Sequence, residues 1–138
     1  MKYHTLAVSL FLIVTTGLPA LALDSGSPLG DTQEVLTTPA EREKALKKFP
    51  KAQQADSAVN NLSSNPKTKE MVYQMSAEIL QTIAVKAEGD PKEMQKMMDE
   101  AQSNPEAFYN SLDPLTQARI RGVANDIQKE KGISQPPN

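Results

Sequence analysis

Two neighbouring carboxylates, Asp99 and Glu100, are the nearest approach to a catalytic pair in this sequence. Paired carboxyl groups must both face one reacting bond, whereas adjacent helical residues point about 100° apart. We therefore expect both to face solvent. The chain has no cysteine and a single histidine, His4, so the residue types for a Ser-His-Asp triad or a zinc, copper or haem site are nearly missing. We predict a protein that is not an enzyme and uses no cofactor or metal.

The other charged residues have spacings typical of a solvated surface. Asp24, Asp31 and Glu34 do not have the spacing of a helix-loop-helix calcium site. A basic run is interleaved with Glu41 and Glu43, the net charge of the chain is −2, and no aromatic platform follows. We predict a solvated helix face and no nucleic-acid partner. The residues of the run are Arg42, Lys44, Lys47, Lys48 and Lys51.

The first 22 residues have the pattern of a secretory signal peptide. Lys2 precedes an apolar core, LAVSLFLIV, at residues 6–14, and Ala20 and Ala22 are the small residues that signal peptidase accepts. The core is too short to cross a bilayer of about 30 Å. We expect an exported protein, periplasmic or secreted, that begins at Leu23 after cleavage and does not insert stably into a membrane.

Methionine is concentrated in one part of the chain, because five of the six methionines lie between positions 71 and 98. Its flexible and polarisable side chain fits irregular apolar partners, although a stripe at helical spacing can equally be ordinary core. The hypothesis that we carry forward is a groove that binds an apolar protein segment. The residues expected to line it are Met71, Met75, Met94, Met97, Met98 and Phe108.

Helix starts recur along the sequence as an Asn, Asp or Thr followed by proline. The side chain can accept an amide proton at the N-cap, and proline at the first helical position loses no hydrogen bond. At Thr38 we also expect a capping box, in which the hydroxyl accepts the amide proton of Glu41. The expected N-caps are Thr38, Asn65, Asp90, Asn104 and Asp113.

Apolar residues between these starts repeat at helical spacing. The longest helix is expected over residues 66–88, ended by Gly89, and the last over 114–131, ended by Gly132. In the last helix, the expected inward stripe consists of Leu115, Ala118, Val123 and Ile127.

These patterns predict an all-α fold, a small bundle of about five short amphipathic helices, because no run of residues alternates with period two. Residues 23–37 are rich in Gly, Ser, Pro and Asp, which predicts a flexible leader. The predicted organisation is a signal peptide at 1–22, the leader at 23–37, one or two weak helices at 38–62, a compact helical domain at 63–132 and a disordered tail at 133–138.

The segment DPKEMQKMMDEAQSNPEAFYNSL, from Asp90 to Leu112, resembles the aspartate-proline domains of stress-inducible co-chaperones and the Met-rich repeats of ubiquilin-type shuttle proteins. A second segment, SSNPKTKEMVYQM at 63–75, resembles a weaker copy, so that the resemblance spans roughly residues 63–132. It implies short helices around a flexible groove for hydrophobic client segments, lined by the six residues named above. The sequence departs from the family in the length of the 66–88 helix and in its signal peptide.

The sequence therefore predicts an exported, non-enzymatic helical protein that binds an apolar segment of a protein partner, as a chaperone-like or adaptor module. Two other functions would use the same features. One is a carrier that encloses a small apolar ligand, and the other is a structural or self-assembling envelope protein.

Overall fold

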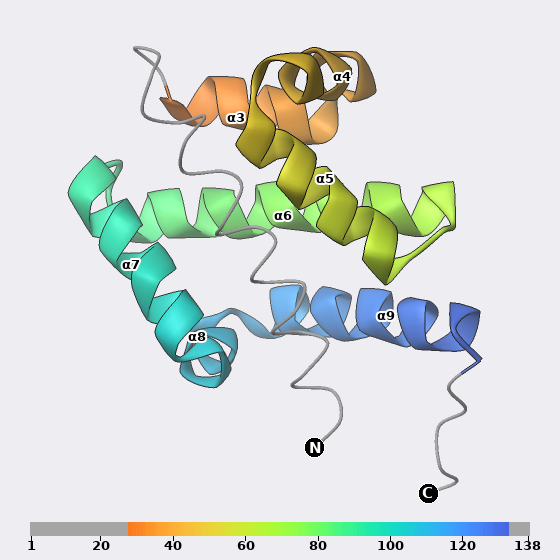
Figure 1. Ribbon diagram of the computed structural model, residues 1–138. Coiled ribbons are helices and arrows are strands. Elements are labelled where there is room, and N and C mark those ends of the chain that lie inside the picture. The colour runs from red at the N-terminus through yellow and green to blue at the C-terminus, as the bar shows by residue number, and fades with distance from the viewer. Residues whose placement is uncertain (1–27, 133–138) are drawn as a thin grey trace, which may run out of the picture.

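The computed structural model describes residues 28–132, and every regular element in that range is a helix (Figure 1). This confirms the all-α class, with more helices than the five or so expected. The predicted signal peptide and tail lie outside the described residues. The helices are α3 (Pro28–Thr37), α4 (Pro39–Lys48), α5 (Pro50–Leu62), α6 (Pro66–Lys86), α7 (Pro91–Ser103), α8 (Pro105–Ser111) and α9 (Pro114–Glu130).

A proline occupies the first position of each of these helices. Four of the five expected N-caps also accept an amide proton through the side chain, which confirms them. The acceptor–donor pairs are Asn65 with Lys67 at 2.9 Å, Asp90 with Lys92 at 2.8 Å, Asn104 with Ala107 at 3.2 Å, and Asp113 with Thr116 at 3.0 Å.

The capping box expected at Thr38 is wrong. Thr38 occupies the N-cap position of α4, but its side chain makes no capping hydrogen bond. The Glu41 carboxylate accepts a hydrogen bond from Lys44 Nζ at 2.6 Å, on the exposed side of the same helix. The helix therefore begins where the extended backbone of Thr38 meets Pro39, and reciprocal side-chain bonds do not contribute.

Residues 28–37, expected to belong to a flexible leader, form helix α3. Leu36 is only 3% exposed and belongs to the hydrophobic core, and α3 packs against both α4 and α6. Sequence analysis missed this helix because residues 23–37 are rich in Gly, Ser, Pro and Asp, whereas Leu36 is buried only through tertiary packing. The remainder of the expected leader, residues 23–27, lies outside the described range.

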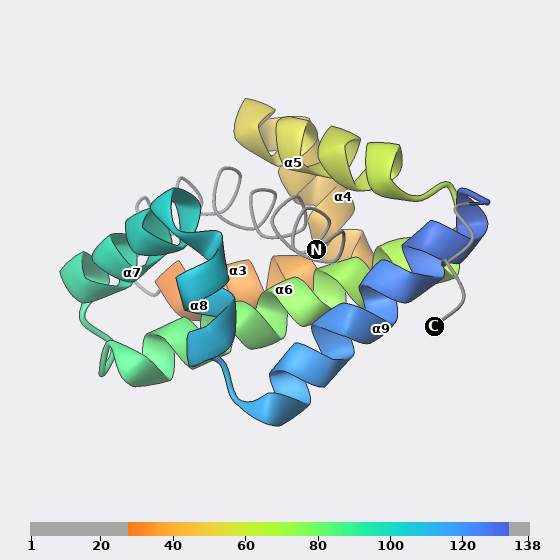
Figure 2. The same cartoon turned by 90° about the horizontal axis from the view of Figure 1, so that it is seen from below.

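Helix α6 is the central element of the fold, and ten of its 21 residues are buried. α3, α5, α7 and α9 all pack against it, with α7 and α8 at one end and α5 toward the other (Figures 1 and 2). α4 packs on α3 and α5, so the segment 38–62, expected to form one or two weak helices, forms two helices that belong to the same body. The compact part therefore begins before residue 63, with Leu36, Val59 and Leu62 in its core.

The inward face of α9 differs from the expected stripe. Val123 and Ile127 are buried as expected, but Leu115 is 64% exposed and Ala118 is also exposed. Residues adjacent on a helix point about 100° apart, so a stripe beginning at residue 116 leaves Leu115 outside. The residues that α9 does bury are Thr116, Ile120, Val123, Ala124, Ile127 and Gln128.

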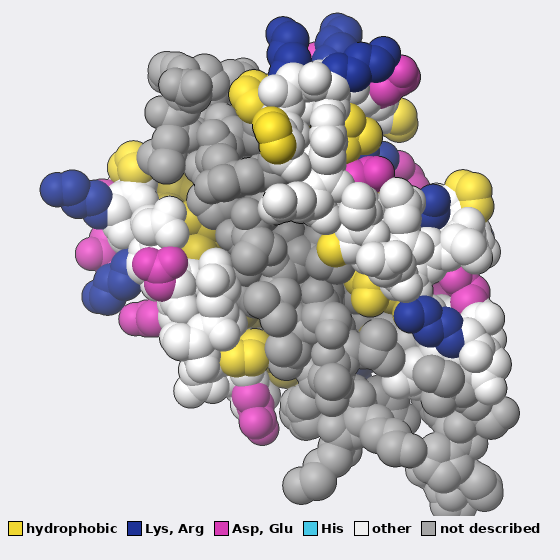
Figure 3. Space-filling view, viewed as in Figure 1, with side chains coloured by type: hydrophobic (Ala, Val, Ile, Leu, Met, Phe, Trp, Pro, Cys, Tyr) yellow, Lys and Arg dark blue, Asp and Glu magenta, His cyan; other side chains and the backbone are white. Residues whose placement is uncertain are grey.

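Lysine and arginine side chains gather over α4 at the top of Figure 3, while the hydrophobic side chains on this face form small separate groups. Lys44 and Lys47 pair with Glu41 and Glu43, as expected for a solvated helix face. Arg42 is the exception, because its side chain is only 13% exposed. None of the helices within residues 28–132 is both long enough and apolar enough to span a membrane.

Candidate functional site

Arg42 and Tyr73 form the centre of a polar cluster that fastens the N-terminal helices to α6. The Arg42 guanidinium donates to both oxygens of Glu70, at 3.0 and 3.3 Å, and to the carbonyl of Leu36 at 2.7 Å. The Tyr73 hydroxyl donates to the carboxylate of Asp56 in α5. The pKa of Tyr73 is raised, mainly because its hydroxyl is buried and secondly because of its bond to Asp56. Directional bonds therefore connect α4, α5 and the end of α3 to α6.

A second polar cluster fastens the end of α9 to the loop between α5 and α6. The Glu130 carboxylate accepts hydrogen bonds from the hydroxyls of Ser63 and Thr68, and these bonds lower the pKa of Glu130. Lys131 Nζ donates to the carbonyl of Asn61 at 3.2 Å. Ser63 and Thr68 are themselves buried, at 4% and 2% exposure. The Glu130 carboxylate thus provides the hydrogen-bond acceptor that these two buried hydroxyls need.

The six residues predicted to line a groove, hereafter the methionine face, all belong to or pack against one hydrophobic cluster. Met75, Met94, Met98 and Phe108 are between 3% and 8% exposed. Met71 and Met97 are half-buried against the same cluster. Four of the predicted residues are therefore part of a closed core, and Met71 and Met97 are the two that keep partial access to solvent.

Helix α7 is attached to its neighbours in a different way from α4, α5 and α9. It packs on α6 and α8 through its apolar side, where Met94, Met98 and Ala101 are buried. The described hydrogen bonds and ion pairs of Gln95, Lys96 and Ser103 all remain within the helix. The buried side chains of Met94, Met98 and Ala101 thus attach α7 to the core through non-directional contacts.

The neighbouring carboxylates Asp99 and Glu100 are both exposed on α7, as expected. Asp99 accepts a hydrogen bond from Gln95 Nε2 at 2.9 Å. Within the described part of the chain, no three histidine, cysteine or acidic side chains gather in a way that could hold a metal ion.

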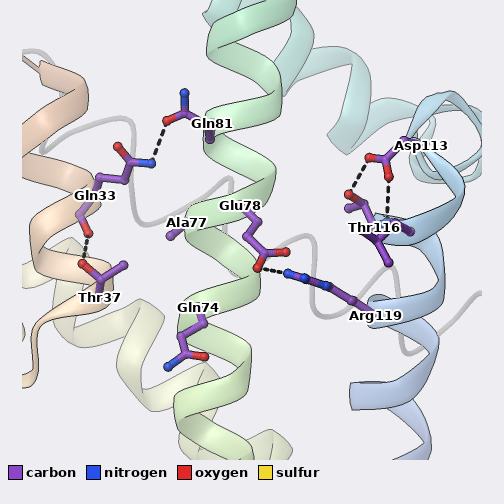
Figure 4. Close-up of a pocket in the computed structure, with 10 residues that line it drawn as sticks. Gln33, Thr37, Gln74, Ala77, Glu78, Gln81, Asp113, Thr116 and Arg119 are labelled. Atoms are coloured by element: carbon purple, nitrogen blue, oxygen red, sulfur yellow. Dashed lines mark hydrogen bonds and ion pairs between the residues drawn. The ribbon is translucent and has the colours of Figure 1, made fainter.

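A groove that the sequence did not lead us to expect lies on α6 between α3 and α9, with polar side chains along a mainly apolar surface (Figure 4). Its volume is about 640 Å³. Gln33 Nε2 of α3 donates to Gln81 Oε1 of α6 at 2.7 Å, and Arg119 of α9 pairs with Glu78 of α6. The only available signal was the helical spacing of Gln74, Glu78 and Gln81, because the two walls come from distant parts of the chain.

Comparison with known proteins does not assign the chain to a family. No protein-family model, no curated protein sequence and no solved structure matches it.

Proposed function

We propose that this protein is an exported, non-enzymatic helical module that binds an apolar segment of another protein at the methionine face. The observation that carries the proposal is the attachment of α7, which rests on buried methionines while the described polar bonds of Gln95, Lys96 and Ser103 stay within the helix. An apolar segment can replace these methionine contacts, while the exposed bond from Lys86 Nζ to the Ser111 carbonyl of α8, at 2.8 Å, can be exchanged for bonds to water.

Binding requires α7 and α8 to move away from α6, since Met94, Met98 and Phe108 are buried in the free protein. Exposing a methionine side chain costs about 1.5–3 kcal/mol, and a partner must offset that cost with its own apolar surface. The polar clusters around Arg42 and Glu130 hold α4, α5 and α9 on α6 during this movement. The rest of the fold therefore provides a fixed platform for the displaced pair of helices.

Binding of a defined peptide tests this proposal. The probe is a fluorescent amphipathic peptide of about 16 residues, rich in leucine on one face and long enough to form a helix when bound. Its anisotropy is followed as the chain from Leu23 is added. We expect saturable binding that Met97→Ser weakens about five- to tenfold, because this edge residue contacts the incoming segment and its loss leaves the core filled.

The matched control is Val85→Ser, which removes a 67% exposed apolar side chain of α6 from outside the methionine face. Circular dichroism verifies that both variants are folded. A folded wild-type protein that does not bind the peptide, or binding that Met97→Ser leaves unchanged, contradicts the proposal. A small apolar molecule retained in gentle mass spectrometry would instead support a carrier, and light scattering that rises with concentration would support self-assembly.

A further inference from the structure

The groove between α3, α6 and α9 is separate from the methionine face and has a different chemistry. Its floor is α6, and α3 and α9 form its walls (Figure 4). Ala77 and Thr116 line it and are themselves buried, at 4% and 8% exposure, so the groove reaches the core between the polar side chains. It is therefore a preformed hollow whose surface is mainly apolar, with polar side chains around it.

Glutamine amides provide most of the hydrogen-bonding capacity of this groove. The amino group of Gln33 donates to the carbonyl of Gln81 at 2.7 Å. The carbonyl of Gln33 and the amino group of Gln81 remain available to a ligand. Gln74 is exposed, and its side chain has no hydrogen-bond partner among the described residues. A carboxamide both donates and accepts, as a peptide group does, so these side chains match a main chain in both roles.

The charges in the groove are already satisfied by neighbours. Arg119 pairs with Glu78, and the Asp113 carboxylate accepts hydrogen bonds from the amide and hydroxyl of Thr116. These bonds from Thr116 also lower the pKa of Asp113 and keep it ionised. The groove thus offers no unpaired cation for a phosphate. Its lining residues include no aromatic ring on which a sugar or base could stack.

Two exposed apolar side chains accompany the amides. Leu115 lines the groove and is 64% exposed. Val85, 67% exposed, continues the face of α6 that carries Gln74 and Gln81, four residues beyond Gln81. Gln74 and Gln81 are seven positions apart, which is about 10 Å along the helix and about the length of three residues of an extended chain.

We infer that this groove binds an extended, uncharged segment of another protein, whose main-chain amides pair with Gln74 and Gln81 and whose apolar side chain contacts Leu115. The site does not depend on the methionine face, which would receive a helical or compact apolar segment. Recognition here rests on the peptide groups of the ligand: a ligand carbonyl accepts from the Gln81 amino group, and ligand N–H groups donate to the carbonyls of Gln74 and Gln33.

The test is an NMR titration of the isotope-labelled chain from Leu23 with two peptides of about eight residues, acetylated and amidated, in which leucine alternates with serine. In the second peptide, alternate backbone nitrogens are methylated, which removes the donors and leaves the side chains unchanged. We expect the first peptide to shift the side-chain amide signals of Gln74 and Gln81 and the methyl signals of Leu115. Methylation, Gln74→Ala and Leu115→Ser should each weaken binding about fivefold or more.

The matched control is Gln54→Ala, which removes an exposed glutamine from α5 outside the groove and should leave the affinity unchanged. Equal binding of the methylated peptide, or shifts confined to α7 and α8, overturns the inference. Shifts of the same groove signals by a soluble oligosaccharide, with none by the peptide, also overturn it and reassign the groove to a glycan. Because Met97 is intact throughout, these outcomes are distinct from a failure at the methionine face.

Discussion

The guanidinium carbon of Arg42 lies 3.6 Å from the centre of the Tyr73 ring. The same guanidinium pairs with Glu70 and donates to the Leu36 carbonyl, and Tyr73 in turn donates to Asp56. A cation over an aromatic face is attracted by the negative charge of the ring, and the attraction is stronger where water is excluded. Through this pair, four helices are joined at one point: α3, α4, α5 and α6.

Replacement of Arg42 is expected to destabilise the protein more than replacement of any lysine on α4. Arg42→Met should lower the free energy of unfolding by about 2 kcal/mol, because it removes a charged hydrogen-bond donor while water can still reach Glu70, which is 33% exposed. Arg42→Lys should cost about 1 kcal/mol, because an ammonium group cannot bind both oxygens of Glu70 in a bidentate pair and also stack on the Tyr73 ring.

Urea denaturation measures both changes. The control is Lys47→Met on the same helix, whose side chain is 72% exposed and whose pairing with Glu43 contributes little. If Arg42→Met is no more destabilising than Lys47→Met, the cluster does not fasten the N-terminal helices as we infer.

The helix starts could be predicted from the sequence because they are local events. Asn65, Asp90, Asn104 and Asp113 each cap a helix through an amide two or three residues further along. Arg42 could not be assigned in this way, because Glu70 is 28 residues away in sequence and its approach depends on how α4 meets α6. For the same reason, the basic run indicated a solvated face and the burial of Arg42 was missed.

The two candidate sites show the same division between local pattern and packing. Helical spacing correctly placed Met75, Met94, Met98 and Phe108 on inward faces, but whether such a face is open depends on which helix covers it. The groove depends on α3, a helix that the composition of residues 23–37 did not predict and whose Leu36 is buried in the core. The helical spacing of Gln74, Glu78 and Gln81 indicates the floor of the groove on α6. The walls, from α3 and α9, depend on tertiary packing and could not be predicted.

Stability is expected to fall in acid partly through Glu130. The bonds from Ser63 and Thr68 lower its pKa in the folded protein, so the folded carboxylate stays charged at a pH where the unfolded chain takes up a proton. The stabilisation is therefore fully present above the ordinary pKa of a glutamate, about 4.3, and is lost as the pH falls toward the lowered value. Urea denaturation of wild type and Glu130→Gln between neutral and acid pH measures it.

We expect the difference in stability between wild type and Glu130→Gln to shrink as the pH is lowered through this interval. The comparison variant is Glu100→Gln, which changes an exposed glutamate on α7. A difference between wild type and Glu130→Gln that stays constant from neutral to acid pH would show that the carboxylate charge does not stabilise the junction.

The N-caps Asp90 and Thr38 should differ in what they contribute. Asp90→Ala removes the acceptor of the Lys92 amide at 2.8 Å and should cost about 1 kcal/mol. Thr38→Ala removes a side chain that makes no capping bond, and should change stability by less than about 0.5 kcal/mol. Denaturation curves give the total effect, and hydrogen exchange of the first amides of α7 shows whether the Asp90 effect is local. Equal costs at the two positions would mean that the side-chain bond is not the source of the stabilisation.

The end of α6 contains two successive residues in the left-handed conformation, Glu88 with φ of 52° and Gly89 with φ of 76°. Gly89 closes the helix by donating its amide to the Ala84 carbonyl at 3.0 Å. A residue with a Cβ is strained there by about 1–2 kcal/mol, whereas glycine adopts this conformation freely but is more mobile in the unfolded chain. Glu88→Gly should therefore raise the free energy of unfolding by about 0.5–1 kcal/mol, and Gly89→Ala should lower it by about 1 kcal/mol.

The opposite signs at neighbouring positions make this prediction specific to backbone conformation. A Cβ at position 89 would meet nothing within 4 Å, so the loss in Gly89→Ala cannot come from a steric clash. Glu88→Ala is the control at position 88, because it removes the charge but keeps the Cβ and its strain. Thermal or urea denaturation of the three variants decides the matter. Should Glu88→Ala stabilise as much as Glu88→Gly, the gain arises from the glutamate side chain, and the left-handed backbone is not its cause.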